Sequence, residues 1–198
     1  MDVISALEQS YDQTAELVAG LTPAELDAPS PCLGWDVRAT LNHLLGATWM
    51  FTLVNQGQAA DEDAGDVIGD DANLAVIAAA KENLASWRQP GAFDGDRSYS
   101  FGTFPAMGAA MLNLEEVVVH NWDIARATGF ELVIDPAVGQ MVYDWGVSIP
   151  LDDFRDHGAF GPEVAVPASA PIVDRLVGLL GRRPAEGNHS LPTRRPPG

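Results

Sequence analysis

Hydrophobic residues recur every three or four positions in four long stretches of the chain. This is the spacing by which an α-helix turns one apolar face toward a core. In the first stretch, Val3, Leu7, Tyr11, Leu17 and Val18 share such a face. The pattern predicts helices over about residues 3–19, 36–56, 71–87 and 104–128.

The ends of these helices carry their own signals. Gly20 ends the first helix, and Asp36 is a good N-cap for the second. Thr103 and Pro105 are expected to open the fourth helix, and Gly129 stands where a C′ glycine closes it. These signals make the fourth helix the best-marked element of the chain.

Shorter elements connect and follow the four helices. Thr22-Pro23 is typical of the start of a short helical turn. Weak alternation predicts a short strand or an extended loop over 94–101, and two further helices are expected at about 136–148 and 170–180. The Pro- and Gly-rich segment 150–170 is expected to be irregular, with an extended piece at 163–167.

The four long helices together predict an all-α protein built as a four-helix bundle with a small irregular C-terminal extension. We expect residues 1–150 to form a metal-binding bundle domain and 151–181 to pack on it. Residues 182–198, rich in Arg and Pro, are expected to be a disordered tail.

Candidate chemistry lies on the second and fourth helices. Glu116 and His120 are four residues apart, so their side chains leave one helical face about one turn, roughly 6 Å, apart. His43 lies on the second helix. If the two helices pack together, the three residues form a His/Glu/His metal site. Three protein ligands with an open fourth position are typical of catalytic metals.

Two neighbours of His120 are candidates for supporting roles. Asp123, three residues further on, could accept a hydrogen bond from the His120 ring, or form an ion pair with Arg126 or with a base distant in the sequence. Asp123 and Arg126 are therefore the candidates for positioning the ligands. Glu115 is five residues from His120 and is expected to face solvent.

Cys32 is the only cysteine, which excludes an internal disulfide and a cysteine-based zinc site. It is interpreted first as a half-buried loop residue, and alternatively as a thiol near the metal or a redox-sensitive position. Its sequence neighbours supply no base to lower the thiol pKa, so we do not expect it to be the nucleophile.

Aromatic residues and a further histidine lie outside the ligand set. Trp35, Trp49 and Trp122 could line a substrate pocket, although aromatic residues at helical spacing usually belong to a core. His157, in an irregular segment, is a weak candidate for the site, and His189 in the tail is discounted. The acidic segment 61–66 lacks the EF-hand pattern and is expected to be a solvated loop.

The net charge of −17 bears on which molecules the protein could bind. The last 18 residues hold four Arg and one Glu and carry +3, so the first 180 carry −20. So acidic a body repels phosphate backbones and anionic lipids, which argues against nucleic-acid and membrane binding. No apolar run approaches the roughly 18–20 residues of a membrane span, and the N-terminus lacks the plan of a signal peptide. We expect a cytoplasmic protein.

Two motifs taken together resemble the DinB-like metal-binding superfamily, and more narrowly its branch with the mycothiol-dependent maleylpyruvate isomerase N-terminal domain. The likeness covers about residues 3–184. The motifs are Pro29-Ser30-Pro31-Cys32-x-Gly34-Trp35 with Leu41-Asn42-His43-Leu44, and Glu116-x-x-x-His120-Asn121-Trp122-Asp123 continuing to Gly129.

The resemblance implies an up-down-down-up bundle with a divalent metal on His43, Glu116 and His120. The metal would be zinc first, with nickel, iron or manganese as alternatives. It also implies mycothiol or a similar low-molecular-weight thiol as cosubstrate, activated for transfer to, or isomerisation of, a small electrophile. The chain is shorter than the isomerase, so the isomerase reaction itself is not carried over.

Two other functions stay open at this point. The metal or ligand could be bound without turnover, which a fourth protein ligand closing the site would favour. Alternatively the three residues never meet and the chain is a helical stress-response module, which a distance above about 5 Å between the two imidazole rings would favour. The sequence allows a homodimer but does not require one.

Overall fold

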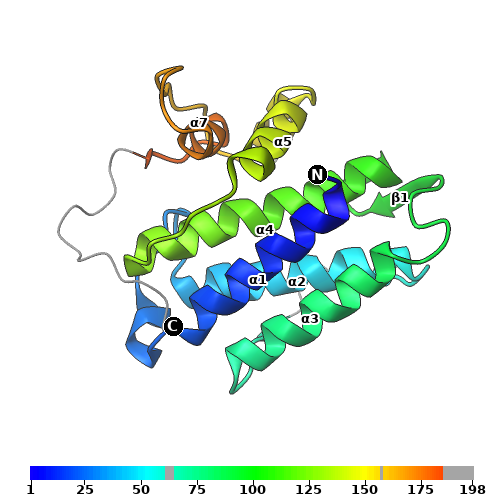
Figure 1. The fold of residues 1–198 in the computed structure, drawn as a ribbon, viewed down its shortest axis with the longest axis horizontal. Helices are drawn as coiled ribbons and strands as arrows, with labels where there is room; N and C mark the ends of the chain where they lie inside the picture. Colours follow the sequence, from blue (N-terminus) through cyan, green and yellow to red (C-terminus); the bar gives the residue numbers. More distant parts are fainter. Residues whose placement is uncertain (61–64, 157, 185–198) are drawn as a thin grey trace.

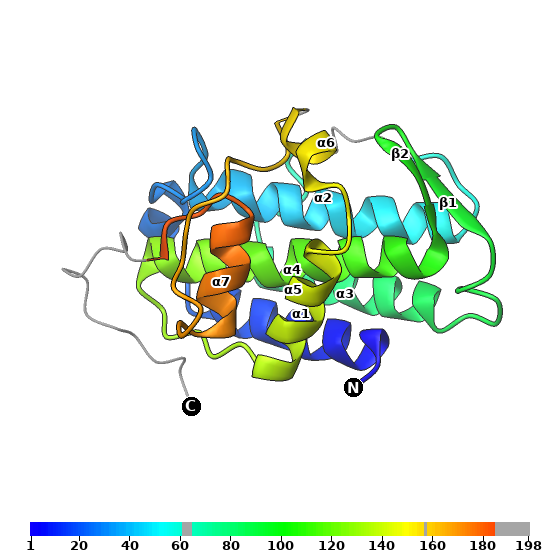
Figure 2. The ribbon, with the colours of Figure 1, turned by 90° about the horizontal axis from the view of Figure 1, so that it is seen from above.

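In a computed structural model of the chain, four long helices pack side by side along most of their length (Figures 1 and 2). The structure describes residues 1–60, 65–156 and 158–184. The predicted all-α fold is confirmed, and each helix begins and ends within two residues of its expected bounds. The four are α1 (Val3–Ala19), α2 (Val37–Asn55), α3 (Ala72–Trp87) and α4 (Ala106–Thr128).

Hydrogen bonds between helices record their directions. Asn73, at the start of α3, donates to the Ala15 carbonyl near the end of α1, so these two helices are antiparallel. Asn55 and Ser86 meet at the ends of α2 and α3, which are therefore parallel. Figure 1 shows α1 and α4 running one way and α2 and α3 the other. The long connection between α2 and α3 returns the chain to the first end of the bundle.

The sequence signals at the helix ends act as expected. The carboxylates of Asp2, Asp36 and Asp71 each accept a backbone N–H of the first turn of α1, α2 and α3. Gly129 adopts a left-handed conformation with φ +73° and ends α4. A capping box also begins the short 3-10 helix η1 (Pro23–Asp27).

A buried hydrogen-bonded chain joins all four long helices. Trp87 of α3 donates to Asn113 of α4 at 2.9 Å, and Asn113 donates to the Tyr11 hydroxyl of α1 at 3.1 Å. The Tyr11 hydroxyl then donates to Thr48 of α2 at 3.3 Å. Since buried polar groups are costly without partners, this series of hydrogen bonds favours one register of the four helices over others.

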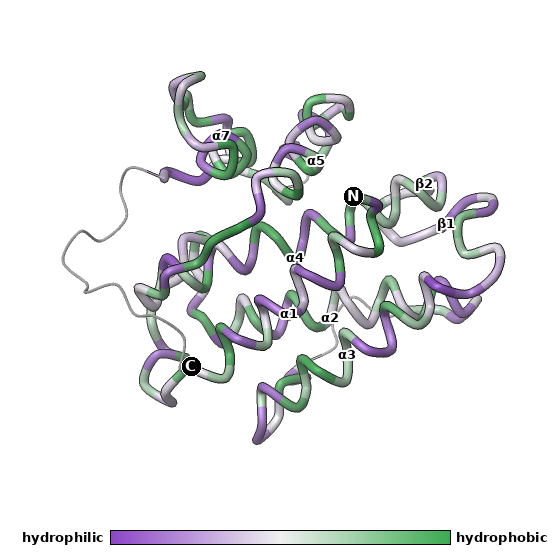
Figure 3. Tube along the Cα trace, in the orientation of Figure 1, coloured by the Kyte–Doolittle hydropathy of each residue, from purple (hydrophilic) through white to green (hydrophobic). Residues whose placement is uncertain are grey.

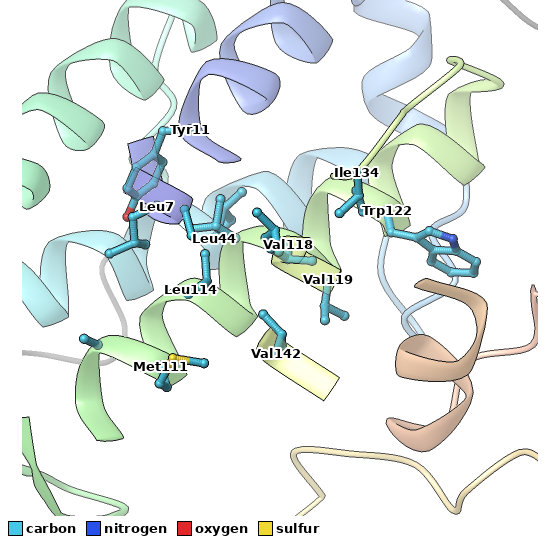
Figure 4. Close-up of a cluster of buried hydrophobic side chains, with 14 of the residues drawn as sticks. Leu7, Tyr11, Leu44, Met111, Leu114, Val118, Val119, Trp122, Ile134 and Val142 are labelled. Atoms are coloured by element: carbon cyan, nitrogen blue, oxygen red, sulfur yellow. The ribbon is translucent and has the colours of Figure 1, made fainter. Parts of the chain in front are cut away.

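Apolar side chains surround these four hydrogen-bonded side chains. Figure 4 shows Leu7 and Tyr11 of α1, Leu44 of α2, and Leu114 and Val118 of α4 turned toward one another, and all five are buried. Hydrophobic and hydrophilic residues alternate along the helices in Figure 3, as the sequence pattern predicts. The core of the bundle is therefore the apolar stripe of each helix.

A β-hairpin precedes α4 and corrects one expectation. Strand β1 (Asp96–Tyr99) falls within the predicted extended stretch, but it pairs antiparallel with β2 (Gly102–Pro105). Thr103 and Pro105, expected to open the helix, lie in β2, and α4 begins at Ala106. Pro105 can end the strand because its extended backbone, with φ −51° and ψ 143°, still leads directly into a helix.

The C-terminal part forms a small layer on α4. Helix α5 (Pro136–Gly146) packs against α7 (Ile172–Leu179), and Figure 1 shows both on the same side of α4. Between them, α6 (Leu151–Asp156) stands in the segment expected to be irregular. An ion pair of Arg155 with Asp152 across one turn supports this short helix. The division of the chain at residue 150 stays a prediction.

Among the residues that the structure describes, no helix is long and apolar enough to span a bilayer. Most of the predicted acidic loop, residues 61–64, lies outside the described residues. The same is true of His157, His189 and residues 185–198 of the predicted tail.

Candidate metal centre

Glu116 and His120 lie one turn apart on one face of α4, as their spacing predicts. Glu116 Oε2 is 3.2 Å from His120 Nε2. The His120 side chain is 7% exposed and that of Glu116 is 26% exposed. A single helical turn therefore brings a carboxylate and an imidazole together where the protein interior meets solvent.

Helix α2 brings His43 to the same carboxylate oxygen. His43 Nε2 is 3.2 Å from Glu116 Oε2, and the centroids of the two imidazole rings are 5.0 Å apart. The preceding Asn42 accepts the backbone N–H groups of Val67 and Ile68 with its side-chain oxygen, which holds the α2–α3 connection against this stretch of α2. The packing of α2 on α4 thus brings the three candidate ligands together.

The spacing of the donor atoms fits a shared metal ion. Two atoms that each bind one tetrahedral zinc at about 2.0–2.1 Å lie about 3.3 Å apart. The two carboxylate–imidazole distances here are both 3.2 Å, and all three donor atoms lie within 4.8 Å of one another. Two imidazoles and a carboxylate are ligands that zinc and other first-row divalent ions accept. His43, whose side chain is 42% exposed, leaves one side of the cluster open to solvent.

Asp123 contacts the other nitrogen of His120. Its Oδ2 is 3.0 Å from His120 Nδ1, and its side chain is fully buried. Burial alone would raise the pKa of Asp123, but the hydrogen bond with His120 and the charge of Arg182 together lower it to about 2. Because an ionised carboxylate only accepts, Nδ1 carries the hydrogen and Nε2 faces the cluster.

The cluster carries charge in its metal-free form. Hydrogen bonds from His120 and His43 hold the pKa of Glu116 below its usual range, although burial opposes this. Burial would lower the pKa of His120, but its hydrogen bonds with Asp123, Cys32 and Glu116 raise it well above the usual value. An ion bound here would therefore displace a proton from Nε2 of His120.

Arg182 is the base distant in the sequence that pairs with Asp123, and the sequence did not identify it. Its Nη2 donates to Asp123 Oδ2 at 3.0 Å and its Nε to Oδ1 at 3.4 Å. The residue stands 59 positions away, in the stretch expected to be a disordered tail, and no local pattern signals the contact. The candidate partner Arg126 instead donates to the Pro184 carbonyl and lies over the Trp122 ring.

The loop before α2 places two more side chains beside His120. The backbone N–H of Trp35 donates to the Cys32 carbonyl at 3.1 Å, and Gly34 between them has φ +82°. A β-turn of type II needs such a residue at its third position. The turn brings Cys32 Sγ to 3.1 Å from Asp123 Oδ2 and sets the Trp35 ring 4.8 Å from that of His43, centroid to centroid.

Cys32 is half-buried, as its first interpretation predicts, and it also lies near the candidate ligands. Cys32, His120 and Asp123 form a second group of possible metal donors. However, Arg182 Nη2 is 3.4 Å from Cys32 Sγ and 3.0 Å from Asp123 Oδ2. Because this fixed cation already lies against the sulfur and the carboxylate, we assign no second ion to that group.

The expectation for Glu115 is wrong. Glu115 is only 3% exposed, because α4 is covered on several sides and position 115 faces inward. Burial, with repulsion from Glu116 as a second cause, raises the pKa of Glu115 to about 8. Of the tryptophans, Trp35 borders the cluster and is 36% exposed, whereas Trp122 is buried and Trp49 packs against the core.

Comparison with known proteins places the chain in a family. The model of the mycothiol maleylpyruvate isomerase N-terminal domain family matches residues 7–125. The chain belongs to this family. The matched part of the chain includes His43, Glu116, His120 and Asp123 and ends before Arg182.

Two relatives match nearly the whole chain. Both are uncharacterized proteins of Mycobacterium tuberculosis, from strains CDC 1551 and H37Rv, and each is 27% identical to this chain. The alignment covers 92% of this chain and 98% of each relative. No solved structure shows significant similarity.

Proposed function

We propose that this protein is a cytoplasmic metal-dependent enzyme that activates a low-molecular-weight thiol of the mycothiol type. His43, Glu116 and His120 hold a divalent ion, zinc first, and the thiol is transferred to a small electrophile or promotes its isomerisation. The observation that carries the proposal is the convergence of three donor atoms, with 3.2 Å between each imidazole nitrogen and the carboxylate oxygen. Membership of a family described by mycothiol supports the choice of thiol.

A bound divalent ion supplies the positive charge that converts a coordinated thiol into its nucleophilic thiolate near neutral pH. The protein's own residues supply the geometry. Asp123 keeps the Nδ1 hydrogen of His120 in place, so that Nε2 is the nitrogen offered to the ion. His43 stands at the exposed side of the cluster, where a small molecule reaches it from solvent.

Trp35 supplies an apolar wall at the same opening. Its ring centroid is 4.8 Å from that of His43 and 6.2 Å from that of His120. Leu33 in the same turn is fully exposed. We propose that this turn contacts the carbon skeleton of the electrophile and excludes water from one side of the reacting sulfur.

The donor arrangement favours a catalytic ion over a structural one. Cys32 Sγ is 3.9 Å from His120 Nδ1, so it lies on the Nδ1 side of the ring and does not join His43 and Glu116 in one group of donors. Within the described residues, no fourth side chain closes the His43, Glu116 and His120 group. An open position is what a thiol or a water needs.

A thiol-consumption assay tests the proposal. Protein purified without a His-tag column is stripped with a chelator, reloaded with zinc, and incubated with mycothiol or bacillithiol and a panel of small electrophiles. We expect consumption only in the loaded protein, and its loss in His120→Ala. Glu16→Ala, an exposed change on α1, is the matched control and should keep full activity.

Two results would count against the proposal. Equal thiol consumption with and without metal would remove the metal from the reaction. Stoichiometric zinc binding with no turnover across the panel would favour a binding protein without catalysis.

A further inference from the structure

Arg182 contacts the candidate metal centre from outside the four-helix bundle. Its side chain is 11% exposed, and its guanidinium makes four hydrogen bonds to the part of the chain that the structure describes. Two go to the carboxylate of Asp123, one goes to the Leu180 carbonyl at 3.2 Å, and one goes to Cys32 Sγ at 3.4 Å. The planar guanidinium therefore contacts both oxygens of one fully buried carboxylate.

Arg182 is a cation held against the Asp123 carboxylate, and its two contacts set the orientation of that carboxylate. Among the described residues, the other hydrogen-bond partners of Oδ2 are the His120 ring at 3.0 Å and the Cys32 thiol at 3.1 Å. An ionised carboxylate in a fully buried position is costly unless a cation pairs with it. The two-point contact also fixes the plane of the carboxylate, so that Oδ2 faces His120 Nδ1.

The end of α7 holds Arg182 in this position. The Arg182 N–H bonds to the Val177 carbonyl at 2.8 Å, and the Gly181 N–H bonds to the Gly178 carbonyl at 3.0 Å. These two bonds, with Gly181 at φ +89°, make the Schellman motif that ends a helix. Arg182 is the residue directly after the motif's glycine, so its backbone is fixed by the helix end.

We propose that Arg182 is a positioning residue for the metal centre. It holds Asp123 so that His120 keeps its hydrogen on Nδ1 and presents Nε2 to the ion. The inference rests on the proposed function, because it assigns Nε2 of His120 to a metal. It adds to the site a residue that lies beyond the part of the chain matched by the family model, which ends at residue 125.

Metal affinity is the first readout. In competition with a chromogenic chelator, Arg182→Gln should bind zinc more weakly than the wild type, by up to the about 10–100-fold lost when the direct partner of a ligating histidine is removed. Arg182→Lys should lose less, because an ammonium still reaches one carboxylate oxygen. Arg175→Gln is the matched control: it removes a cation of the same helix that lies over Tyr143, 4.5 Å from the ring centroid. Its affinity should be unchanged.

Nitrogen NMR of the histidine rings is the second readout, and it uses the metal-free protein. We expect a protected Nδ1–H signal of His120 in the wild type and in Arg175→Gln, and its loss in Arg182→Gln. A general loss of stability would affect both variants and would leave this signal in the folded fraction. Should Arg182→Gln not fold, Arg182→Lys provides both readouts.

The outcomes separate the two proposals. A wild type that binds no metal contradicts the proposed function, while the NMR comparison still decides whether Arg182 orients His120 through Asp123. Wild-type affinity together with an unchanged Nδ1–H signal in Arg182→Gln would overturn the role of Arg182. Equal weakening in Arg175→Gln would do the same.

Discussion

At the scale of single residues, His120 joins two sets of contacts through its two ring nitrogens. Nε2 faces Glu116 and His43, and Nδ1 faces Asp123, with Cys32 and Arg182 behind it. The first set offers donors to an ion, whereas the second contains a fixed cation. This difference is the physical reason for placing the metal on the Nε2 side.

Glu115 gives a prediction on pH dependence. Its pKa rises from the usual 4.5 to about 8 in the folded protein, because it is buried and next to Glu116. Between these pH values the unfolded chain loses its proton while the folded chain keeps it, so stability falls as pH rises. Replacing Glu115 with Gln removes this contribution to the pH dependence of the unfolding free energy. At its steepest the contribution is about 1.4 kcal/mol per pH unit.

Urea unfolding of the chelator-treated protein at pH 5, 6, 7 and 8 measures this effect. We expect the wild type to lose more unfolding free energy across the series than Glu115→Gln. Glu16→Gln, an exposed acid on α1, is the control and should follow the wild type. Parallel pH profiles for the wild type and Glu115→Gln would contradict the assigned burial cost.

The residues of the site differ in how far the sequence predicts them. The spacing of Glu116 and His120 predicts their contact because it depends on one helical turn. His43 could be proposed only on the condition that α2 and α4 pack together. Arg182 and the inward position of Glu115 could not be predicted. The contact of Arg182 depends on where the C-terminal layer lies on α4, and the burial of Glu115 depends on how the neighbouring elements cover α4.

At the scale of elements, the helix end of α7 determines where Arg182 lies. A Cβ added to Gly181 would come within 2.6 Å of the Gly161 Cα, and the φ of +89° disfavours any side chain there. We therefore expect Gly181→Ala to separate the end of α7 from the backbone at Gly161. The cost should be about 2–4 kcal/mol, combining the left-handed backbone with the clash.

Chemical unfolding compares this change with a matched glycine. Gly158 has a similar φ of +79°, but a Cβ there would meet nothing within 4 Å. Gly158→Ala should cost only the backbone term, about 1–2 kcal/mol. Gly181→Ala should also bind zinc more weakly, because Arg182 moves with the helix end. Equal losses of stability in the two variants would contradict the close packing.

The elements themselves were largely predictable. Periodicity and capping residues located the four long helices because each of these signals is local. Strand β2 could not be predicted, since Thr103 and Pro105 also suit a helix start. Only the pairing with β1 determines that these residues form a strand. Helix α6 depends on a short ion pair and on burial of Leu151 in the C-terminal layer, which no periodic pattern reveals in six residues.

At the scale of the whole molecule, the candidate site joins the bundle to the C-terminal layer. The ligands come from α2 and α4, the turn with Cys32 and Trp35 covers one side, and Arg182 arrives after α7. Figure 2 shows α7 and the loop before α2 at the same end of the molecule. Arg182 thus provides a buried cation beside Asp123, the carboxylate that contacts the candidate ligand His120.

The central claim is that His43, Glu116 and His120 bind a divalent ion with one position open. X-ray absorption at the zinc edge, on zinc-loaded protein purified without a His-tag column and without added thiol, tests it most directly. We expect one zinc per chain with two imidazoles and only oxygen besides, at about 2.0–2.1 Å, and one imidazole fewer in His43→Ala. A sulfur at about 2.3 Å, or no bound zinc, would contradict it.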